Sequence, residues 1–151
     1  MKSRIYEGAK PYRRVLCDTG RRDSTVNSDL RSLVDGPNQA HLATLMPDGA
    51  PHCVPVWVGL EGERIAFLTS PTVRKARNVM RDPRVAISIT DRDQPFTMAT
   101  VRGRVVEKVE GDAAWEIIDR ISIKYTTGPY PRDEARCVFL VQPAATFATA
   151  Y

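Results

Sequence analysis

The sequence has few of the side chains that mark a disulfide framework, a metal site or a catalytic centre. It contains three cysteines, two histidines and 7% aromatic residues. Cys17, Cys53 and Cys137 are widely spaced and form no C-x-x-C pair, so we expect reduced thiols and no bound metal. No apolar run approaches the roughly 20 residues that span a bilayer, and no signal-peptide core follows Arg13-Arg14. We therefore expect a cytoplasmic protein.

Catalytic motifs are also missing. The chain has no G-x-S-x-G elbow, no H-E-x-x-H, no P-loop and no G-x-G-x-x-G fingerprint. His41 and His52 fall on adjacent expected strands without a partner pattern for metal binding or general-base catalysis. No catalytic side chain is assigned from the sequence, and we expect the chemistry to belong to a bound cofactor.

The formal net charge of +4 arises at one end of the 151-residue chain. Residues 1–31 hold eight Lys or Arg and four Asp or Glu, whereas the remainder holds fourteen of each. We predict a basic N-terminal arm over residues 1–26 and a single domain over residues 27–151. A nucleic-acid partner is not expected, because the basic excess lies in the arm and few aromatic rings are present for base stacking.

The rest of the chain predicts short strands that are joined mostly by tight turns. Helices are expected at 29–35 with Asn27-Ser28 as the cap, at 71–81 with Ser70 as cap and Pro71 at the first helical position, and at 112–125. Strands are expected at 40–46, 51–60, 64–69, 84–91, 97–110 with a bulge or close approach at Gly103, and 136–142, with 144–151 extending the last across Pro143. This pattern indicates a mostly β protein with a barrel-like antiparallel sheet, because parallel strands need longer crossovers.

One segment carries a concentration of groups that bind anions. Residues 69–78 run from the end of a strand into a helix, where hydroxyls, free N–H groups and the helix dipole converge. Five cations and one acid lie between Arg74 and Arg84. These features fit a phosphate site, although spacing alone slightly favours a solvated helix face whose arginines pair with carboxylates.

Three stretches occur in an order that resembles a known superfamily. They are HLATLMPDGAPHCVPVW from residue 41, FLTSPTVRKARNVMRDPRVAISI from residue 67 and VRGRVVE from residue 101. Together they resemble the split-barrel flavin and deazaflavin oxidoreductases, the superfamily of pyridoxamine 5'-phosphate oxidase, and most of all the branch that uses the deazaflavin coenzyme F-420. The resemblance implies a split β-barrel of six or more antiparallel strands, like that of FMN-binding proteins.

The resemblance also implies a site and an assembly. It places the cofactor phosphate near Thr69, Ser70, Arg74, Lys75 and Asn78. It places the cofactor ring against the backbone of Pro55, Val56 and Trp57. Such proteins are typically homodimers with cofactor sites between subunits. The sequence departs from the family at the helix start, where Pro71-Thr72-Val73 replaces small or glycine-containing residues.

The implied activity is hydride transfer from reduced F-420 to a small conjugated or unsaturated organic substrate. Tyr125 and Tyr130 are candidate donors if a proton must follow the hydride. Two alternatives stay open. One is an FMN-dependent oxidoreductase resembling pyridoxamine 5'-phosphate oxidase, and the other is a non-catalytic protein of the same fold that binds a flavin or a tetrapyrrole.

Overall fold

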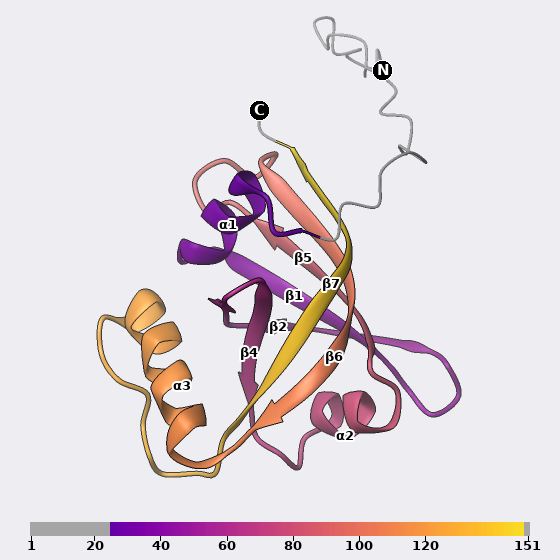
Figure 1. Ribbon diagram of the computed structural model, residues 1–151, viewed down its shortest axis with the longest axis vertical. Helices are drawn as coiled ribbons and strands as arrows, with labels where there is room; N and C mark the ends of the chain where they lie inside the picture. The colour runs from indigo at the N-terminus through magenta and orange to yellow at the C-terminus, as the bar shows by residue number, and fades with distance from the viewer. Residues whose placement is uncertain (1–24, 150–151) are drawn as a thin grey trace, which may run out of the picture.

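Seven antiparallel strands form one curled sheet in the computed structural model, which describes residues 25–149 (Figure 1). The order across the sheet is β2-β1-β5-β6-β7-β4-β3. The elements are α1 (Ser28–Asp35), β1 (Gln39–Leu45), β2 (Pro51–Val56), β3 (Val58–Glu61), β4 (Arg64–Thr69), α2 (Arg74–Arg81), β5 (Arg84–Thr90), β6 (Met98–Val109), α3 (Gly111–Thr126) and β7 (Cys137–Thr149). The expected split antiparallel barrel is therefore confirmed, and residues 1–24 of the predicted arm lie outside the described residues.

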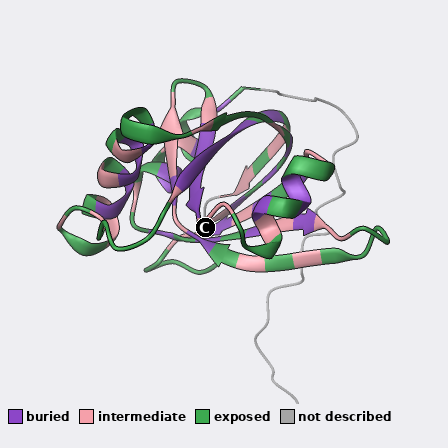
Figure 2. Cartoon of the chain, turned by 90° about the horizontal axis from the view of Figure 1, so that it is seen from below, coloured by how far each residue is buried: buried purple, intermediate pink, exposed green. Residues whose placement is uncertain are grey.

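The interior of the barrel is built from the inward-facing positions of the strands. Along β1 and β5, buried and more exposed residues alternate, as a sheet with one face on the core requires. Phe67 of β4 and Phe139 of β7 lie at the centre, fully buried and stacked with ring centroids 5.5 Å apart. Buried positions concentrate on the strands and on the helix sides that face them (Figure 2). Along these two strands, successive residues thus face the core and the outer surface in turn.

The three helices cover different parts of this barrel. α1 and α2 contribute buried residues to the interior cluster, including Leu30 and Val79. α3 packs instead on the outer face of β4 and β7, where its stripe of Ile117, Ile118 and Ile121 meets residues such as Leu140. β4 and β7 are consequently buried on both faces, which explains the nearly continuous apolar run of β4.

The turns and caps follow the sequence at several expected places. Asn27 caps α1, its side chain accepting a hydrogen bond from the Leu30 N–H at 2.9 Å. Gly49, at φ 85°, completes the turn between β1 and β2 in a conformation that suits glycine. At Gly103 the register of β6 shifts against β7, and a Cβ there would lie 2.4 Å from the Gln142 carbonyl oxygen. The predicted bulge and close approach are both confirmed.

Two expected element boundaries are wrong. α2 begins at Arg74 rather than Pro71, and Val73 occupies the N-cap position, whereas the Ser70 hydroxyl lies 3.3 Å from that of Thr72. The β-branched Thr72 and Val73 are weaker helix formers than the Arg-Lys-Ala run that follows. The single strand expected over 51–60 is divided at Trp57, because the barrel places β2 and β3 at opposite edges of the sheet.

Two further observations concern the cysteines and the helices. Cys53 is exposed and Cys137 is buried, and both are free thiols, whereas Cys17 lies outside the described residues. Within residues 25–149, no helix has the length and apolar character needed to cross a membrane.

Candidate functional site

A cavity of about 270 Å³ lies where the chain passes from β2 to β3. It is lined by Gln39, Pro55, Val56, Trp57, Leu68, Lys75 and Tyr130. The structure thus brings the three residues expected against the cofactor ring together with one residue expected at the phosphate. The cavity combines an apolar wall with a cationic side chain, and this composition suits an anionic ligand that also has apolar surface.

Lys75, in the first turn of α2, supplies a half-buried ammonium to this cavity. Burial lowers the pKa of Lys75, and the nearby Arg136 guanidinium lowers it further. Arg136 itself is bound to the Glu134 carboxylate at 2.8 Å and donates to the Tyr130 hydroxyl at 3.4 Å. Lys75 has no carboxylate partner within the described chain. A bound anion would therefore offset both the burial of its charge and the repulsion by Arg136.

Donors without partners gather at the end of β4. Thr69 is 4% exposed, and its Oγ1 has no hydrogen-bond partner among residues 25–149. α2 begins a few residues later without a side-chain cap, so its first N–H groups have no intrahelical acceptor. A buried hydroxyl without a partner is costly, and an uncapped helix N-terminus attracts negative charge. Groups of these two kinds are the donors that an anion site uses.

We expect Thr69→Val to raise the thermal midpoint while weakening the binding of inorganic phosphate. The substitution removes a buried hydroxyl without a partner at nearly constant volume, which would add about 1 kcal/mol of stability and raise the midpoint by roughly 2–4 °C. Thermal unfolding and phosphate titration of the same sample measure both effects. Thr100→Val, at an exposed position of β6 outside the cavity, is the matched control. A lowered midpoint with unchanged phosphate binding would contradict the assignment.

Two residues that the sequence places at the phosphate lie elsewhere. Arg74 is exposed and does not line the cavity. Asn78 is fully buried, and its amide donates to the Thr44 Oγ1 at 3.0 Å and contacts the Met46 sulfur at 3.6 Å. Asn78 therefore fastens α2 to β1, and its contact with a cofactor stays a prediction. Ser70 lies between the cavity residue Leu68 and α2, with its hydroxyl near that of Thr72.

Sequence reasoning missed Arg136 and Gln39 and named Tyr130 only as a proton donor. Thr69 and Cys137 are register partners in β4 and β7, which brings Arg136 beside the end of β4. No local pattern signals this pairing, because the two strands are separated by most of the domain. A lone arginine just before a β-strand gave no indication of its role.

The tyrosine candidates for proton transfer differ in their surroundings. The Tyr125 hydroxyl donates to the Asn38 carbonyl oxygen at 3.0 Å, and burial raises its pKa. Its proton is thus held by the backbone and does not face the cavity. Tyr130 lines the cavity, and its hydroxyl accepts a hydrogen bond from Arg136.

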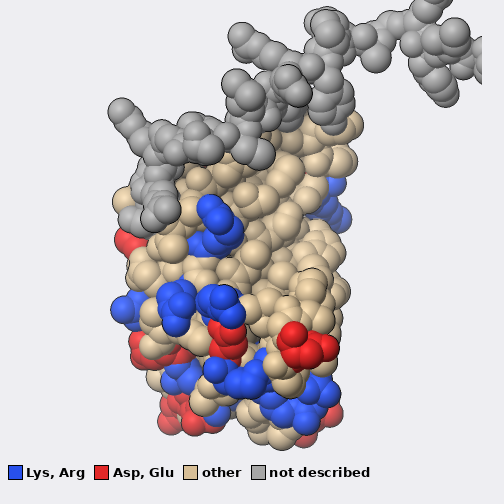
Figure 3. All heavy atoms as spheres, turned by 90° about the vertical axis from the view of Figure 1, so that its right-hand side faces the viewer, with Lys and Arg blue, Asp and Glu red and all other residues tan. Residues whose placement is uncertain are grey.

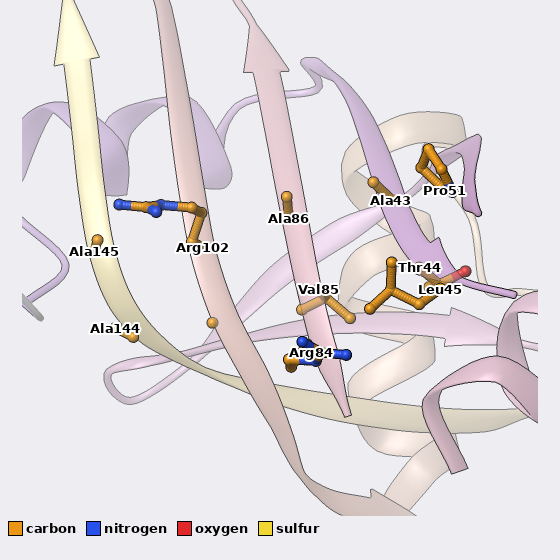
Figure 4. A pocket seen from close by; sticks show the side chains of 11 residues that line it. Ala43, Thr44, Leu45, Pro51, Arg84, Val85, Ala86, Arg102, Ala144 and Ala145 are labelled. Atoms are coloured by element: carbon orange, nitrogen blue, oxygen red, sulfur yellow. The ribbon is translucent and has the colours of Figure 1, made fainter. Parts of the chain in front are cut away.

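A second, larger hollow of about 450 Å³ lies on the outer face of β1, β5, β6 and β7 (Figure 4). Small side chains, including Ala43, Ala86 and Ala145, form much of its surface. Arg84 at its border is bound to Asp82 at 2.7 Å. None of the residues expected at a cofactor lines this hollow. The smaller cavity is the stronger candidate site because Lys75 and the three residues expected at the cofactor ring line it, and because Thr69 and the start of α2 lie next to lining residues along the chain.

The sheet order defines a split-barrel protein, and its candidate pocket lies at the junction of β2 and β3. The sequence model of the family described as pyridoxamine 5'-phosphate oxidase matches residues 27–150, and the chain belongs to this family. The resemblance seen in the sequence is therefore confirmed.

Two solved structures illustrate the similarity. A protein named F-420 reductase is 33% identical, with a TM-score of 0.69 over 78% of this chain and 94% of that one. A conserved hypothetical protein from Mycobacterium tuberculosis is 28% identical, with a TM-score of 0.66 over 86% of this chain and 89% of that one. Among curated proteins, none matches the chain.

Proposed function

We propose that this protein is an oxidoreductase that binds the deazaflavin coenzyme F-420 and transfers a hydride from its reduced form to a small conjugated or unsaturated organic substrate. The observation that carries the proposal is the group of donors and cations near the cavity, formed by the partnerless Thr69 hydroxyl, the uncapped start of α2, Lys75 and the already paired Arg136. The similarity to a protein named F-420 reductase supports the choice of coenzyme.

The residues present fit a cofactor that has a phosphate at one end and a flat ring at the other. Thr69, Ser70 and Lys75 would hold the phosphate, with Arg136 adding positive charge behind Lys75. The backbone of Pro55, Val56 and Trp57 would face the polar edge of the ring. When bound, the reduced coenzyme supplies the hydride.

The chain's own contribution is then binding, orientation and exclusion of water. Trp57 and Tyr130 present aromatic surface to the cavity, with ring centroids 5.9 Å apart in an edge-to-face arrangement. Holding two reactants in one geometry lowers the barrier without any catalytic side chain. This accounts for the lack of a nucleophile or general-base motif in the sequence.

We further propose a homodimer with a cofactor site between the subunits. The outer face of β1, β5, β6 and β7 shows several small or apolar side chains to solvent beside Arg84 and Arg102, including Phe147 at 42% exposure. Charged side chains gather toward the end of the molecule where α2 lies, and the part above them is mostly uncharged (Figure 3). A second copy on this face would cover apolar surface that a monomer leaves in water.

The two free thiols Cys53 and Cys137 support a reducing, cytoplasmic location.

Side-by-side titration of the purified protein with F-420 and with FMN tests the coenzyme assignment. We expect tighter binding of F-420, followed by oxidation of the reduced coenzyme when a conjugated acceptor is added. Tighter binding of FMN would contradict the F-420 assignment and favour the FMN-dependent oxidoreductase. Binding of a tetrapyrrole with neither coenzyme would establish the non-catalytic alternative.

A further inference from the structure

The barrel has a seam at Trp57, the single residue between the two edge strands of the sheet. β2 ends at Val56 and pairs with β1, whereas β3 begins at Val58 and pairs with β4. Backbone groups at a sheet edge have no neighbouring strand and need other partners. At Val58 these partners come from α3. The Tyr125 hydroxyl accepts from the Val58 N–H at 3.4 Å, and the Lys124 ammonium donates to the Val58 carbonyl oxygen at 2.5 Å.

The same two side chains also bind the segment that enters the barrel. Lys124 donates to the Val34 carbonyl oxygen in the last turn of α1, where the helix dipole favours a cation. Tyr125 donates to the Asn38 carbonyl oxygen, immediately before β1. Adjacent residues of one helix turn thus join α1, the start of β1 and the start of β3.

α3 packs closely against β3, which holds Lys124 and Tyr125 within hydrogen-bond distance of Val58. A Cβ at Gly59 would lie 2.7 Å from Cγ1 of Ile121, so only glycine leaves room for α3 at this distance. Burial lowers the pKa of Lys124 to about 8, with a smaller opposing effect of Asp35. The two backbone carbonyl oxygens that Lys124 contacts offset part of the cost of burying an ammonium.

Trp57 connects the seam to the cavity. Its ring stacks on that of Tyr125, with centroids 5.0 Å apart and planes 6° from parallel. Trp57 and the two residues before it, Pro55 and Val56, form one wall of the cavity. The conformation of this wall therefore depends on where α3 holds Tyr125 and the backbone of Val58.

We propose that Lys124 and Tyr125 are positioning residues that fix the seam and thereby set the shape of the ring-binding wall, without contacting the phosphate. The inference rests on the proposed function only for the identity of the ring. It separates two parts of the site, a phosphate part held by α2 and β4 and a ring part held by α3.

Trp57 can report on the seam directly, because the sequence has only two tryptophans. In a Trp115→Phe background, Trp57 is the sole indole, and its acrylamide quenching is measured without any cofactor. Tyr125→Phe keeps the stacked ring and removes one oxygen, and Lys124→Met removes the ammonium at similar length. We expect about twofold stronger quenching of Trp57 in both variants. We also expect about tenfold weaker binding of whichever coenzyme the parent protein binds, with orthophosphate binding unchanged, where tenfold equals about 1.4 kcal/mol.

Lys108→Met is the matched control, since Lys108 is paired with Glu110 on the surface and contributes nothing to the seam. Unchanged Trp57 quenching in Tyr125→Phe would overturn the inference, whatever Lys124→Met does to folding. Equal losses of orthophosphate and coenzyme binding would also overturn it, because they would show a general loosening of the fold. A parent protein that binds neither F-420 nor FMN would overturn the proposed function, and the quenching result alone would then decide the inference.

Discussion

Lys75→Ala is expected to weaken cofactor binding by roughly 10- to 150-fold. Hydrogen bonds to charged groups contribute about 1.5–3 kcal/mol, and Lys75 is the cation that lines the cavity. The half-buried ammonium also has a lowered pKa, because burial and Arg136 both disfavour its charge. Binding of an anion should therefore weaken as the pH rises through that lowered pKa, before an ordinary lysine loses its proton. Fluorescence titration of the coenzyme over a pH series measures both effects.

Arg74→Ala is the matched control for this prediction. It removes one positive charge from the adjacent residue, but Arg74 is exposed and outside the cavity. Sequence reasoning alone gives Arg74 and Lys75 equal effects, whereas the structure predicts a change of less than about threefold for Arg74, as for a screened surface charge. Equal losses for both residues would show that long-range charge, rather than the buried site, holds the phosphate.

Phe139→Ala is expected to lower the free energy of unfolding by about 3–5 kcal/mol. Phe139 is fully buried and stacks on Phe67 at the centre of the barrel. The pair Phe67–Phe139 lies two register positions from the pair Thr69–Cys137 in the ladder of β4 and β7. Loss of the Phe139 ring should therefore also loosen the phosphate part of the site. Urea unfolding measures the stability, and orthophosphate titration at low urea measures the second effect.

Phe147→Ala provides the comparison on the same strand. Phe147 is 42% exposed, and its truncation should cost less than about 1 kcal/mol in a monomer. A similar cost for both substitutions would contradict the division of β7 into a core-facing half and an outer half. If the loss of unfolding free energy in Phe147→Ala grows with protein concentration, a second copy buries the outer face.

Much of the fold follows from local patterns in the sequence. A short apolar run predicts β1, and alternating apolar residues predict β5. The Pro47-Asp48-Gly49 turn predicts the first hairpin, and the apolar stripe of α3 predicts its packing face. The continuation of the last strand across Pro143 is also confirmed. The break at Trp57 escapes such reasoning, because valine-rich residues on both sides suit a strand equally well. Only closure of the barrel requires the chain to leave one sheet edge there and join the other.

The site follows from the sequence only where its residues are neighbours along the chain. Thr69 and Lys75 are found together because a strand end runs into a helix start. Arg136 joins them through the pairing of β4 with β7, and Lys124 reaches Val58 through the packing of α3, neither of which has a local signal. Arg74 has the same charge as Lys75 and a neighbouring position, but it is exposed and does not line the cavity, so its contact with a cofactor stays a prediction.

The place of β7 between β6 and β4 has a consequence for how the protein is made. β7 is the last of the described strands to leave the ribosome, yet it lies inside the sheet and pairs on both sides. Until it emerges, the nascent chain holds two separate pieces of sheet, β2-β1-β5-β6 and β4-β3, each with open edges. Such edges invite pairing with other chains. Translation that stalls before residue 137 should therefore yield aggregation-prone fragments rather than a smaller folded domain.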